Sequence, residues 1–460
     1  MLMNIMFINP PYKSMIQEFL GAHAPLLGFG SMSYQLEREG HNIEVLDCPT
    51  MGLNLSDAAK FVGKVDPDVV GITSTTPSFG EACKMARAVK DLKPECMVVM
   101  GGPHVSFEDY STLKSSYVDV VVRGEGELTM RDLVKCLEKG ESLSKVLGIT
   151  YREKGVIRRN PDRPFIEDLD ALFVSYHKLP MSRYKFEGLN YATIVSSRGC
   201  PYGCVFCSSS LLHGKKWRCQ SAERVGREVR FLIDEYGVKH IEFLDDLFTF
   251  NNKRVEEICR IFLREKLDVQ WFCSSRVDTI SNELMAKMRR AGCIGIYFGI
   301  ESGCQRILNL LRKGTRIQQA VEAVRGAKEI GIETVATFIL GIPGETVDDI
   351  RQTIRFAKLL KPDYAQFTFC TPYPGTELYK FAKANNMLLS EDWSHYTTME
   401  PVLKVSGLSV TELKNLFKEA YLNFVPSSLW KLIKKRKFRL IEKILLETTK
   451  MVTSDFLRHQ

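Results

Sequence analysis

The stretch SSRGCPYGCVFCSSS, residues 196–210, places Cys200, Cys204 and Cys207 within eight residues. A 4Fe–4S cluster is normally held by four cysteine thiolates, so three on one short loop leave one iron open to a small molecule. Structural zinc instead takes four ligands, commonly from paired Cys-x2-Cys units. The sequence contains no second such pair. The spacing therefore predicts an iron–sulfur cluster, with Phe206 beside it as a shield from water.

Length and composition describe an ordinary globular chain. Its 460 residues predict two or three domains of ~100–200 residues each. The 45% hydrophobic and 26% charged content is typical of globular proteins, and no apolar run approaches the ~18–20 residues that span a bilayer. The opening MLMNIMFI lacks the features of a signal peptide. With no export signal, thirteen cysteines indicate a reducing compartment and metal or redox use, so we expect a cytoplasmic protein.

Residues 1–150 alternate strand-like apolar runs with amphipathic stretches. The predicted strands are 4–10, 42–47, 69–74, 97–102 and 118–124. This α/β alternation predicts a doubly wound, Rossmann-like parallel sheet. Ligands of such sheets bind outside the carboxyl ends of the strands, where we expect the loops 9–12, 74–78, 101–104 and 124–127.

Residues 190–390 alternate in the same way. Between them and the first domain, a predicted connector over 151–189 begins with a hairpin at 151–165. The predicted strands of the second domain are 191–197, 240–246, 269–275, 294–300, 334–340 and 364–370. Six such units predict a partial (β/α)6 version of the eight-stranded barrel, whose active sites lie at the C-terminal mouth. The cysteine triplet follows the first of these strands.

Residues 391–460 are predicted to be mostly helical. They carry the basic run KLIKKRKFR, residues 431–439, in a chain whose formal net charge is +8. This run is interpreted as a solvated helix face or, alternatively, as peripheral contact with a membrane or another acidic partner.

The triplet after the first strand of a six-unit barrel resembles the radical S-adenosylmethionine superfamily. The resemblance continues, in order, through FLDDLF (243–248), SSRVD (274–278), FGIESG (298–303), FILGIPGET (338–346) and CTPYPGT (370–376). It implies contacts to S-adenosylmethionine from Phe206, Asp246, Arg276, Glu301, Gly341, Ile342 and Pro343. Asp246 is favoured over Asp245 for the methionine amine. Each position also has a structural interpretation: helix capping by the paired Asp, an Arg partner for Glu301, and a turn and N-cap for GIPGE.

The N-terminal segment resembles the cobalamin-binding domain fused to one branch of that superfamily. The matching stretches include NPP, PLLGFGSMSYQLEREGHNIEVLD, PDVVGITSTTPS, VVMGGPH and VDVVVRGEGE. The resemblance implies cobalamin contacts from Pro10, Pro11, Leu27, Ser74, Thr75, Thr76, Gly101, Gly102, His104, Gly124 and Glu125.

One departure concerns the lower ligand of cobalt. Many cobalamin proteins carry Asp-x-His-x-x-Gly, whereas residues 47–52 here read DCPTMG, with Pro49 in place of the His. This stretch follows the second predicted strand, although the motif belongs after the first. We therefore expect no His ligand from this motif. His23, His41 and His104 have no motif support, and His104 is interpreted as a loop residue that makes hydrogen bonds.

Together the resemblances imply an enzyme that cleaves S-adenosylmethionine to a 5′-deoxyadenosyl radical and transfers a methyl group through cobalamin. The implied substrate is an unactivated carbon of a small molecule, lipid or tetrapyrrole, with a flavodoxin- or ferredoxin-type electron donor. The alternatives are radical cyclisation, rearrangement or oxidative ring formation without net methyl transfer. A tRNA methylthiotransferase and a non-enzymatic redox or cobalamin sensor are lesser alternatives. Without an RNA-binding motif, nucleic acid is not an expected partner.

Overall fold

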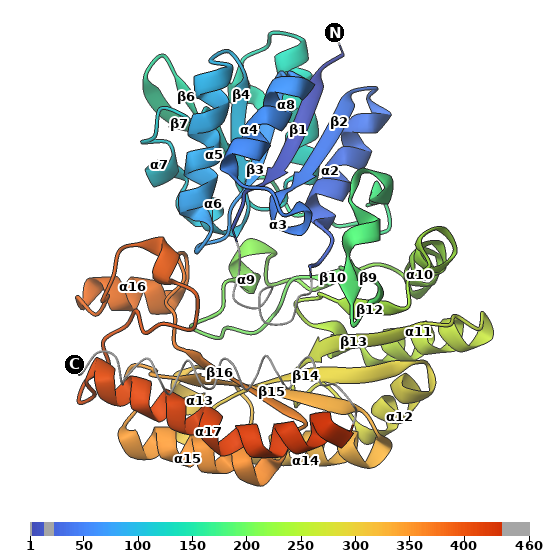
Figure 1. Cartoon of the computed structure of the whole chain (residues 1–460), viewed down its shortest axis with the longest axis vertical. Helices are drawn as coiled ribbons and strands as arrows, with labels where there is room; N and C mark the ends of the chain where they lie inside the picture. Colours follow the sequence, from blue (N-terminus) through green and yellow to red (C-terminus); the bar gives the residue numbers. More distant parts are fainter. Residues whose placement is uncertain (1, 13–22, 435–460) are drawn as a thin grey trace.

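The computed structural model describes residues 2–12 and 23–434, the last ten of them by backbone only. Two seven-stranded sheets build the molecule, and they lie one above the other in Figure 1. The first has the strand order β2-β1-β3-β4-β5-β6-β7 and the second β16-β15-β14-β13-β12-β9-β8. The chain is therefore α/β in both parts, as predicted.

The N-terminal sheet is doubly wound. Its first five strands are parallel: β1 (Asn4–Asn9), β2 (Asn42–Asp47), β3 (Val69–Thr73), β4 (Met97–Gly101) and β5 (Val120–Val122). Helices α2 (Leu27–Arg38) and α8 (Glu127–Glu138) pack together on one face. Helices α4 (Leu55–Val65) and α5 (Phe79–Leu92) cover the other. Both faces are buried, as expected for a parallel sheet.

The predicted hairpin extends this first sheet. Strands β6 (Ile149–Glu153) and β7 (Val156–Arg159) pair antiparallel with each other, and β6 pairs antiparallel with β5. The beginning of the predicted connector is thus a part of the N-terminal sheet. From there the chain crosses to the second sheet with little regular structure apart from the short turns η2 (Tyr176–Lys178) and η3 (Met181–Arg183).

The second sheet confirms the predicted partial barrel. Six strands run parallel in chain order: β9 (Leu189–Ile194), β12 (His240–Phe243), β13 (Gln270–Ser275), β14 (Cys293–Glu301), β15 (Glu333–Leu340) and β16 (Tyr364–Phe369). The short β8 (Lys185–Phe186) adds an antiparallel edge. The helices between the strands are α10 (Ala222–Tyr236), α11 (Asn252–Arg264), α12 (Asn282–Arg290), α13 (Gln305–Leu310), α14 (Ile317–Ile330) and α15 (Val347–Leu360). The sheet curls without closing (Figure 1).

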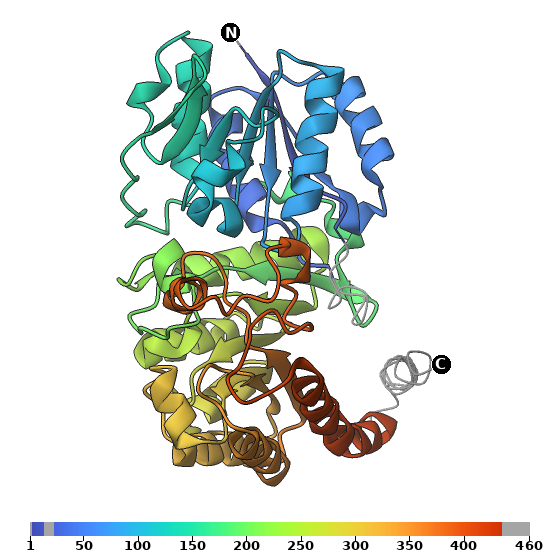
Figure 2. The same ribbon diagram turned by 90° about the vertical axis from the view of Figure 1, so that its left-hand side faces the viewer.

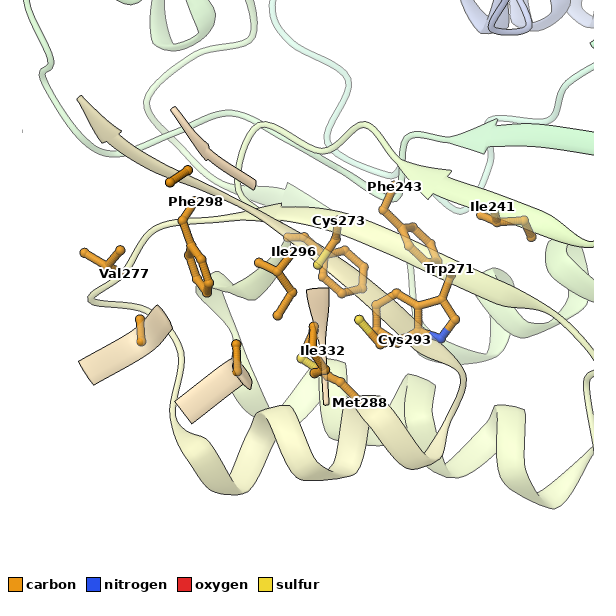
Figure 3. Packing of buried hydrophobic residues seen from close by; sticks show 14 of the residues in the cluster. Ile241, Phe243, Trp271, Cys273, Val277, Met288, Cys293, Ile296, Phe298 and Ile332 are labelled. Carbon is orange, nitrogen blue, oxygen red and sulfur yellow. The ribbon is translucent and has the colours of Figure 1, made fainter. Parts of the chain in front are cut away.

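The core of the second domain lies between its sheet and the surrounding helices. Alternate residues of β13 and β14, including Trp271, Cys273, Ile296 and Phe298, point to this side and are fully buried (Figure 3). This alternation follows from the two-residue period of a strand. The Trp271 indole also donates a 2.8 Å hydrogen bond to the carbonyl oxygen of Ala291, so its one polar atom is satisfied.

The C-terminal segment contacts both domains. Helix α16 (Glu377–Ala384) and turn η5 (Trp393–His395) precede the long helix α17 (Val410–Lys434). Helix α17 packs on β16 and α15, and its Phe417 ring stacks on Phe369 with centroids 4.1 Å apart. Turn η5 lies against α5 of the N-terminal domain, and its Trp393 ring contacts the His104 ring with centroids 5.0 Å apart. In the turned view of Figure 2 an orange-red segment of the C-terminal part lies next to the blue domain.

The helical prediction for residues 391–460 is met as far as the structure is described. The side chains of the basic run 431–439 lie outside the described residues. Among the described helices, none has the length and apolar content required to cross a membrane.

We expect Trp271→Ala to lower the free energy of unfolding by about 3–5 kcal/mol, because it opens a cavity in the core of the second domain. Leu359→Ala is the matched control, since this side chain is 77% exposed and its loss should change stability by less than about 0.5 kcal/mol. Denaturant unfolding of both variants checks the expectation. Equal losses would contradict the described core.

Candidate active site

The carboxyl ends of the two sheets face one another across a cavity of about 310 Å³. From the N-terminal domain the cavity wall includes four glycines, Gly28, Gly102, Gly124 and Gly126. From the barrel it includes residues that follow β9 and β12, among them Ser197, Leu244 and Asp246. A second cavity of about 210 Å³ is also lined by Gly124, Glu125 and Leu212. The predicted ligand-binding edges of both domains thus border a common space.

The cysteine triplet lies on a loop closed by a two-stranded ribbon. Strands β10 (Ser197–Arg198) and β11 (Arg218–Cys219) pair antiparallel, and residues 199–217 form the loop between them, including the short helix α9 (Ser209–Leu212). Gly199 has φ +90°, and a Cβ atom there would lie 2.3 Å from the carbonyl oxygen of Lys216. Only glycine fits this close approach. The Cys200 amide donates to the Gly214 carbonyl oxygen at 3.1 Å and fixes the base of the loop.

The three thiols are partly buried and unbridged. Burial raises the pKa of Cys200 and of Cys204, while the positive charges of Lys313 and Arg276 act in the opposite direction on Cys204. Within the described part of the chain, no three His, Cys, Asp or Glu side chains are placed to hold a metal ion. In a 4Fe–4S cluster each thiolate binds a different iron, so the three need not converge on one atom. The loop therefore fits a cluster better than a single ion.

Two cations stand beside the cysteine loop. The Arg276 guanidinium lies 3.5 Å from the centroid of the Tyr202 ring, inside the loop, and it donates to Asp278 and to the Lys313 carbonyl oxygen at 2.8 Å each. Lys313 Nζ lies 2.8 Å from Glu301 Oε1, and both side chains are buried. Glu301 ends β14 at a register shift with φ +69°, a conformation that only a few per cent of non-glycine residues adopt.

The structure places the predicted Arg276 and Glu301 beside the cysteine loop. The structural interpretation of Glu301 expected an arginine as its partner, but the partner is Lys313. Sequence reasoning missed Lys313. It lies on a loop between α13 and α14, where no periodic pattern marks a charged residue as buried.

The paired aspartates have different environments. Asp245 is buried and accepts hydrogen bonds from the Ser196 amide and from the Ser196 and Ser197 hydroxyls, so its carboxylate is fully engaged in holding the chain. Asp246 lines the cavity, and its Oδ2 accepts from the Gly199 amide and pairs with His213 Nδ1, both at 2.8 Å. Burial opposes the ionisation of Asp246. The hydrogen bond from His213 and the positive charge of that ring nevertheless hold the pKa of Asp246 below its usual value.

This difference agrees with the preference for Asp246, whose contact with the methionine amine remains a prediction. His213 was not singled out from the sequence. It comes six residues after Cys207, where no spacing marks it as a partner of Asp246.

The GIPGE loop after β15 is built around Glu345. The Gly341 and Ile342 amides donate to Glu345 Oε2 at 2.7 and 3.0 Å, and Thr346 then caps α15. Burial raises the pKa of Glu345 to about 7, although the two amides act against it. The loop is thus a tight turn and helix cap, as its structural interpretation states. The contact of Gly341, Ile342 and Pro343 with adenine stays a prediction.

The predicted cobalamin residues all lie at the carboxyl edge of the N-terminal sheet, but only some line the cavity. Leu27, Gly102, Gly124 and Glu125 do so. The cavity wall does not include Pro10, Pro11, Ser74, Thr75, Thr76, Gly101 or His104. Gly102 has φ +103°, and a Cβ atom there would lie 2.6 Å from the Ser74 carbonyl oxygen. A wall of glycines lets the backbone approach a broad, flat ligand closely, which suits a corrin ring.

His104 makes a structural contact outside the cavity wall. Its Nδ1 lies 3.3 Å from Thr76 Oγ1, and its ring lies 4.4 Å from the Phe79 ring and 5.0 Å from the Trp393 ring, between centroids. Burial lowers the pKa of His104 to about 4, so the ring is neutral at ordinary pH. The hydrogen bond agrees with the interpretation of His104, but the residue lies on the short helix α6 (Pro103–Phe107) and not in a loop.

His41 lies at the opposite end of the sheet, where its Nδ1 accepts from the Met3 amide at 3.3 Å. The DCPTMG stretch forms the short helix α3 (Cys48–Met51), which Gly52 ends in a left-handed conformation. Asp47 is buried and accepts from Tyr184 Oη at 2.9 Å. The spacing of this stretch thus has a structural explanation, and it supplies no His.

Comparisons with known proteins agree with this geometry. The Radical SAM superfamily profile matches residues 194–357, and the B12 binding domain profile matches residues 20–134. An uncharacterized methyltransferase of Pyrococcus horikoshii is 44% identical over 424 residues, 92% of each chain. The chain belongs to the cobalamin-binding radical S-adenosylmethionine enzymes. It is an enzyme of the methyltransferase-like branch, and its cofactors are a 4Fe–4S cluster, S-adenosylmethionine and cobalamin.

Two further comparisons place this cobalamin-binding radical S-adenosylmethionine enzyme among its relatives. The anaerobic magnesium-protoporphyrin IX monomethyl ester cyclase of Rubrivivax gelatinosus is 29% identical over 92% of this chain and 77% of its own. The solved methyltransferase TsrM of Kitasatospora setae, with cobalamin and a [4Fe-4S] cluster bound, shares the fold at a TM-score of 0.74 and 16% identity, over 93% of this chain and 89% of its own.

Cys204→Ala should abolish the visible absorption of the cluster after anaerobic reconstitution, because one of three thiolate ligands is lost. Cys83→Ala, on α5 of the N-terminal domain, is the control and should retain it. An unchanged spectrum in Cys204→Ala would refute the ligand assignment.

The Glu345 carboxyl predicts a pH dependence of stability. Its pKa rises from an ordinary 4.5 to about 7 on folding, so the stabilisation it provides is complete below its unfolded pKa and is lost as the pH rises through about 7. Between about pH 5 and about pH 8 the free energy of unfolding should therefore fall more steeply in the native chain than in Glu345→Gln. Denaturant unfolding across this range measures the difference, and equal slopes would show that the carboxyl does not titrate there.

Proposed function

We propose that the chain is a C-methyltransferase acting on an unactivated carbon of a small-molecule, lipid or tetrapyrrole substrate. The observation that carries the proposal is the shared cavity, which has a glycine-rich wall on the cobalamin-binding side and is lined on the barrel side by Leu212 and His213 of the cysteine loop. A substrate carbon in this space would have the two cofactors on opposite sides. The 44% identity to a methyltransferase, over 92% of both chains, supports the same reaction.

When bound, the cluster and S-adenosylmethionine would supply a carbon-centred radical, and cobalamin would supply a transferable methyl group. The residues of the chain hold and shield these groups. Arg276 and Lys313 bring positive charge to Cys204, which offsets the negative charge that three thiolates gather on one loop. Asp246 holds the Gly199 amide, next to Cys200, and presents a carboxylate to the cavity.

Ring formation without net methyl transfer is a second candidate. The observation that favours it is the 29% identity to a tetrapyrrole cyclase across 92% of this chain. Both reactions would use the same cavity, so the product distinguishes them.

Anaerobic turnover with S-adenosylmethionine carrying a labelled methyl group tests the proposal on candidate lipids and tetrapyrroles. We expect 5′-deoxyadenosine together with a product that contains the label. Formation of 5′-deoxyadenosine with an unlabelled, cyclised product would replace methyl transfer with the second candidate. The Cys204→Ala enzyme is the control and should form neither.

The electron donor is part of the proposal. Reduction of the cluster calls for a low-potential donor, and we propose a flavodoxin or ferredoxin in the cytoplasm. The match to the B12 binding domain over residues 20–134 supports a substrate other than nucleic acid.

A further inference from the structure

Two buried carboxylates of the N-terminal domain reach into the barrel. Glu125 and Glu127 belong to the GEGE stretch that follows β5, where Glu127 is the first residue of α8, and the side chains of both are only 4% exposed. Their cationic partners are Arg198 and Arg218, which belong to the other domain. Glu125 was predicted as a cobalamin contact, yet its carboxylate is engaged by these arginines and by the Ile166 amide. The pair therefore fastens one domain to the other.

The two arginines lie in the ribbon of β10 and β11, residues 197–198 and 218–219, which we call the neck of the cysteine loop. Arg198 on β10 and Arg218 on β11 are direct cross-strand partners in the two-residue ribbon that closes residues 199–217. Like charges placed directly opposite in an antiparallel pair destabilise it. A ribbon this short has little other pairing to compensate. The neck therefore depends on negative charge supplied from outside the ribbon.

The two glutamates supply that charge. Arg198 Nη1 lies 3.2 Å from Glu125 Oε1, and Arg198 Nη2 lies 2.6 Å from Glu127 Oε1. Arg218 donates to both oxygens of Glu125, at 2.9 and 3.2 Å. Burial opposes the ionisation of Glu127, but the Arg198 charge holds its pKa below the usual value. Two positive and two negative charges thus balance in a desolvated place, where removal of one partner is costly.

We propose that Glu125 and Glu127 are positioning residues that close the neck of the cysteine loop, so that the cobalamin-binding domain completes the cluster site of the barrel. The cysteines all belong to the barrel, but the loop that carries them is held at its base by the neighbouring domain. This inference goes beyond the proposed reaction, because it applies whether the product is methylated or cyclised. It also links the two cofactor-binding domains through side chains of the chain itself.

Hydrogen exchange of the cofactor-free protein tests the proposal without any turnover. In Glu125→Gln/Glu127→Gln we expect the amides of residues 198–219 to exchange at least about tenfold faster, because the unneutralised arginines open the neck. Amides in the strands β13 to β15 should be unchanged. The single variant Glu127→Gln, which leaves Arg198 paired with Glu125, should show a smaller effect of the same kind. Iron and sulfide retained after anaerobic reconstitution should fall in the same order.

A third substitution separates charge balance from general damage. Adding Arg198→Met to the double variant removes the cross-strand repulsion, so it should restore much of the lost protection and of the iron content. The matched control is Asp119→Asn, which removes a carboxylate from Lys90 and the Val98 amide at the amino-terminal end of β5, the end of that strand opposite to Glu125. It should leave exchange at 198–219 unchanged.

Three results would overturn the proposal. The first is exchange at 198–219 in the double variant that equals that of the native chain. The second is exchange that rises equally in the neck and in the barrel strands, which would indicate general destabilisation. The third is a triple variant no better protected than the double. None of these depends on which reaction the enzyme catalyses.

Discussion

Four charges at the boundary between the domains, three of them buried and Arg198 partly buried, join the two halves of this enzyme. Glu125 and Glu127 come from the carboxyl edge of one sheet, and Arg198 and Arg218 from the carboxyl edge of the other. Parallel strands place their ligand-binding loops at that edge, so joining the two edges encloses a common cavity. The ion pairs link the cobalamin side of this cavity to the cluster side. A radical reaction benefits from such an arrangement, since the reactive space is bounded by protein on both sides.

The two sides of the cavity differ in chemistry, and the difference follows from the residues. The N-terminal side presents glycine backbone, which suits a broad ring that brings its own chemistry. The barrel side presents Leu212 and His213 of the cysteine loop. The positive charges of Arg276 and Lys313 act on Cys204 of the same loop, which favours a thiolate there. Asp246 links the second domain's sheet to that loop through the Gly199 amide. The protein thus positions the cofactors and sets the charge around them, while the cofactors supply the reactive groups.

Much of the fold could be predicted from the sequence because both sheets are parallel and buried, which makes their strands read as short apolar runs. The strands β2 and β12 to β16 begin or end within a residue or so of the predicted limits, except that β12 stops before its two aspartates. The cysteines were predictable because their spacing is local.

The site residues that could not be predicted from the sequence act through contacts between distant segments. Lys313, His213, Arg198 and Arg218 each act through a partner on another element, and no local pattern marks them. The ion-pairing role of Glu125 could not be predicted either. A GEGE turn at a strand end predicts a ligand loop, whereas its carboxylate binds the opposite domain.

We expect one molecule of this enzyme to hold a 4Fe–4S cluster and cobalamin on opposite sides of the same cavity. The most direct test is electron paramagnetic resonance of protein loaded with both cofactors, with the cluster reduced and the cobalt paramagnetic. We expect a magnetic interaction between the two centres that disappears in Cys204→Ala. Two independent, unperturbed signals from fully loaded protein would contradict this arrangement.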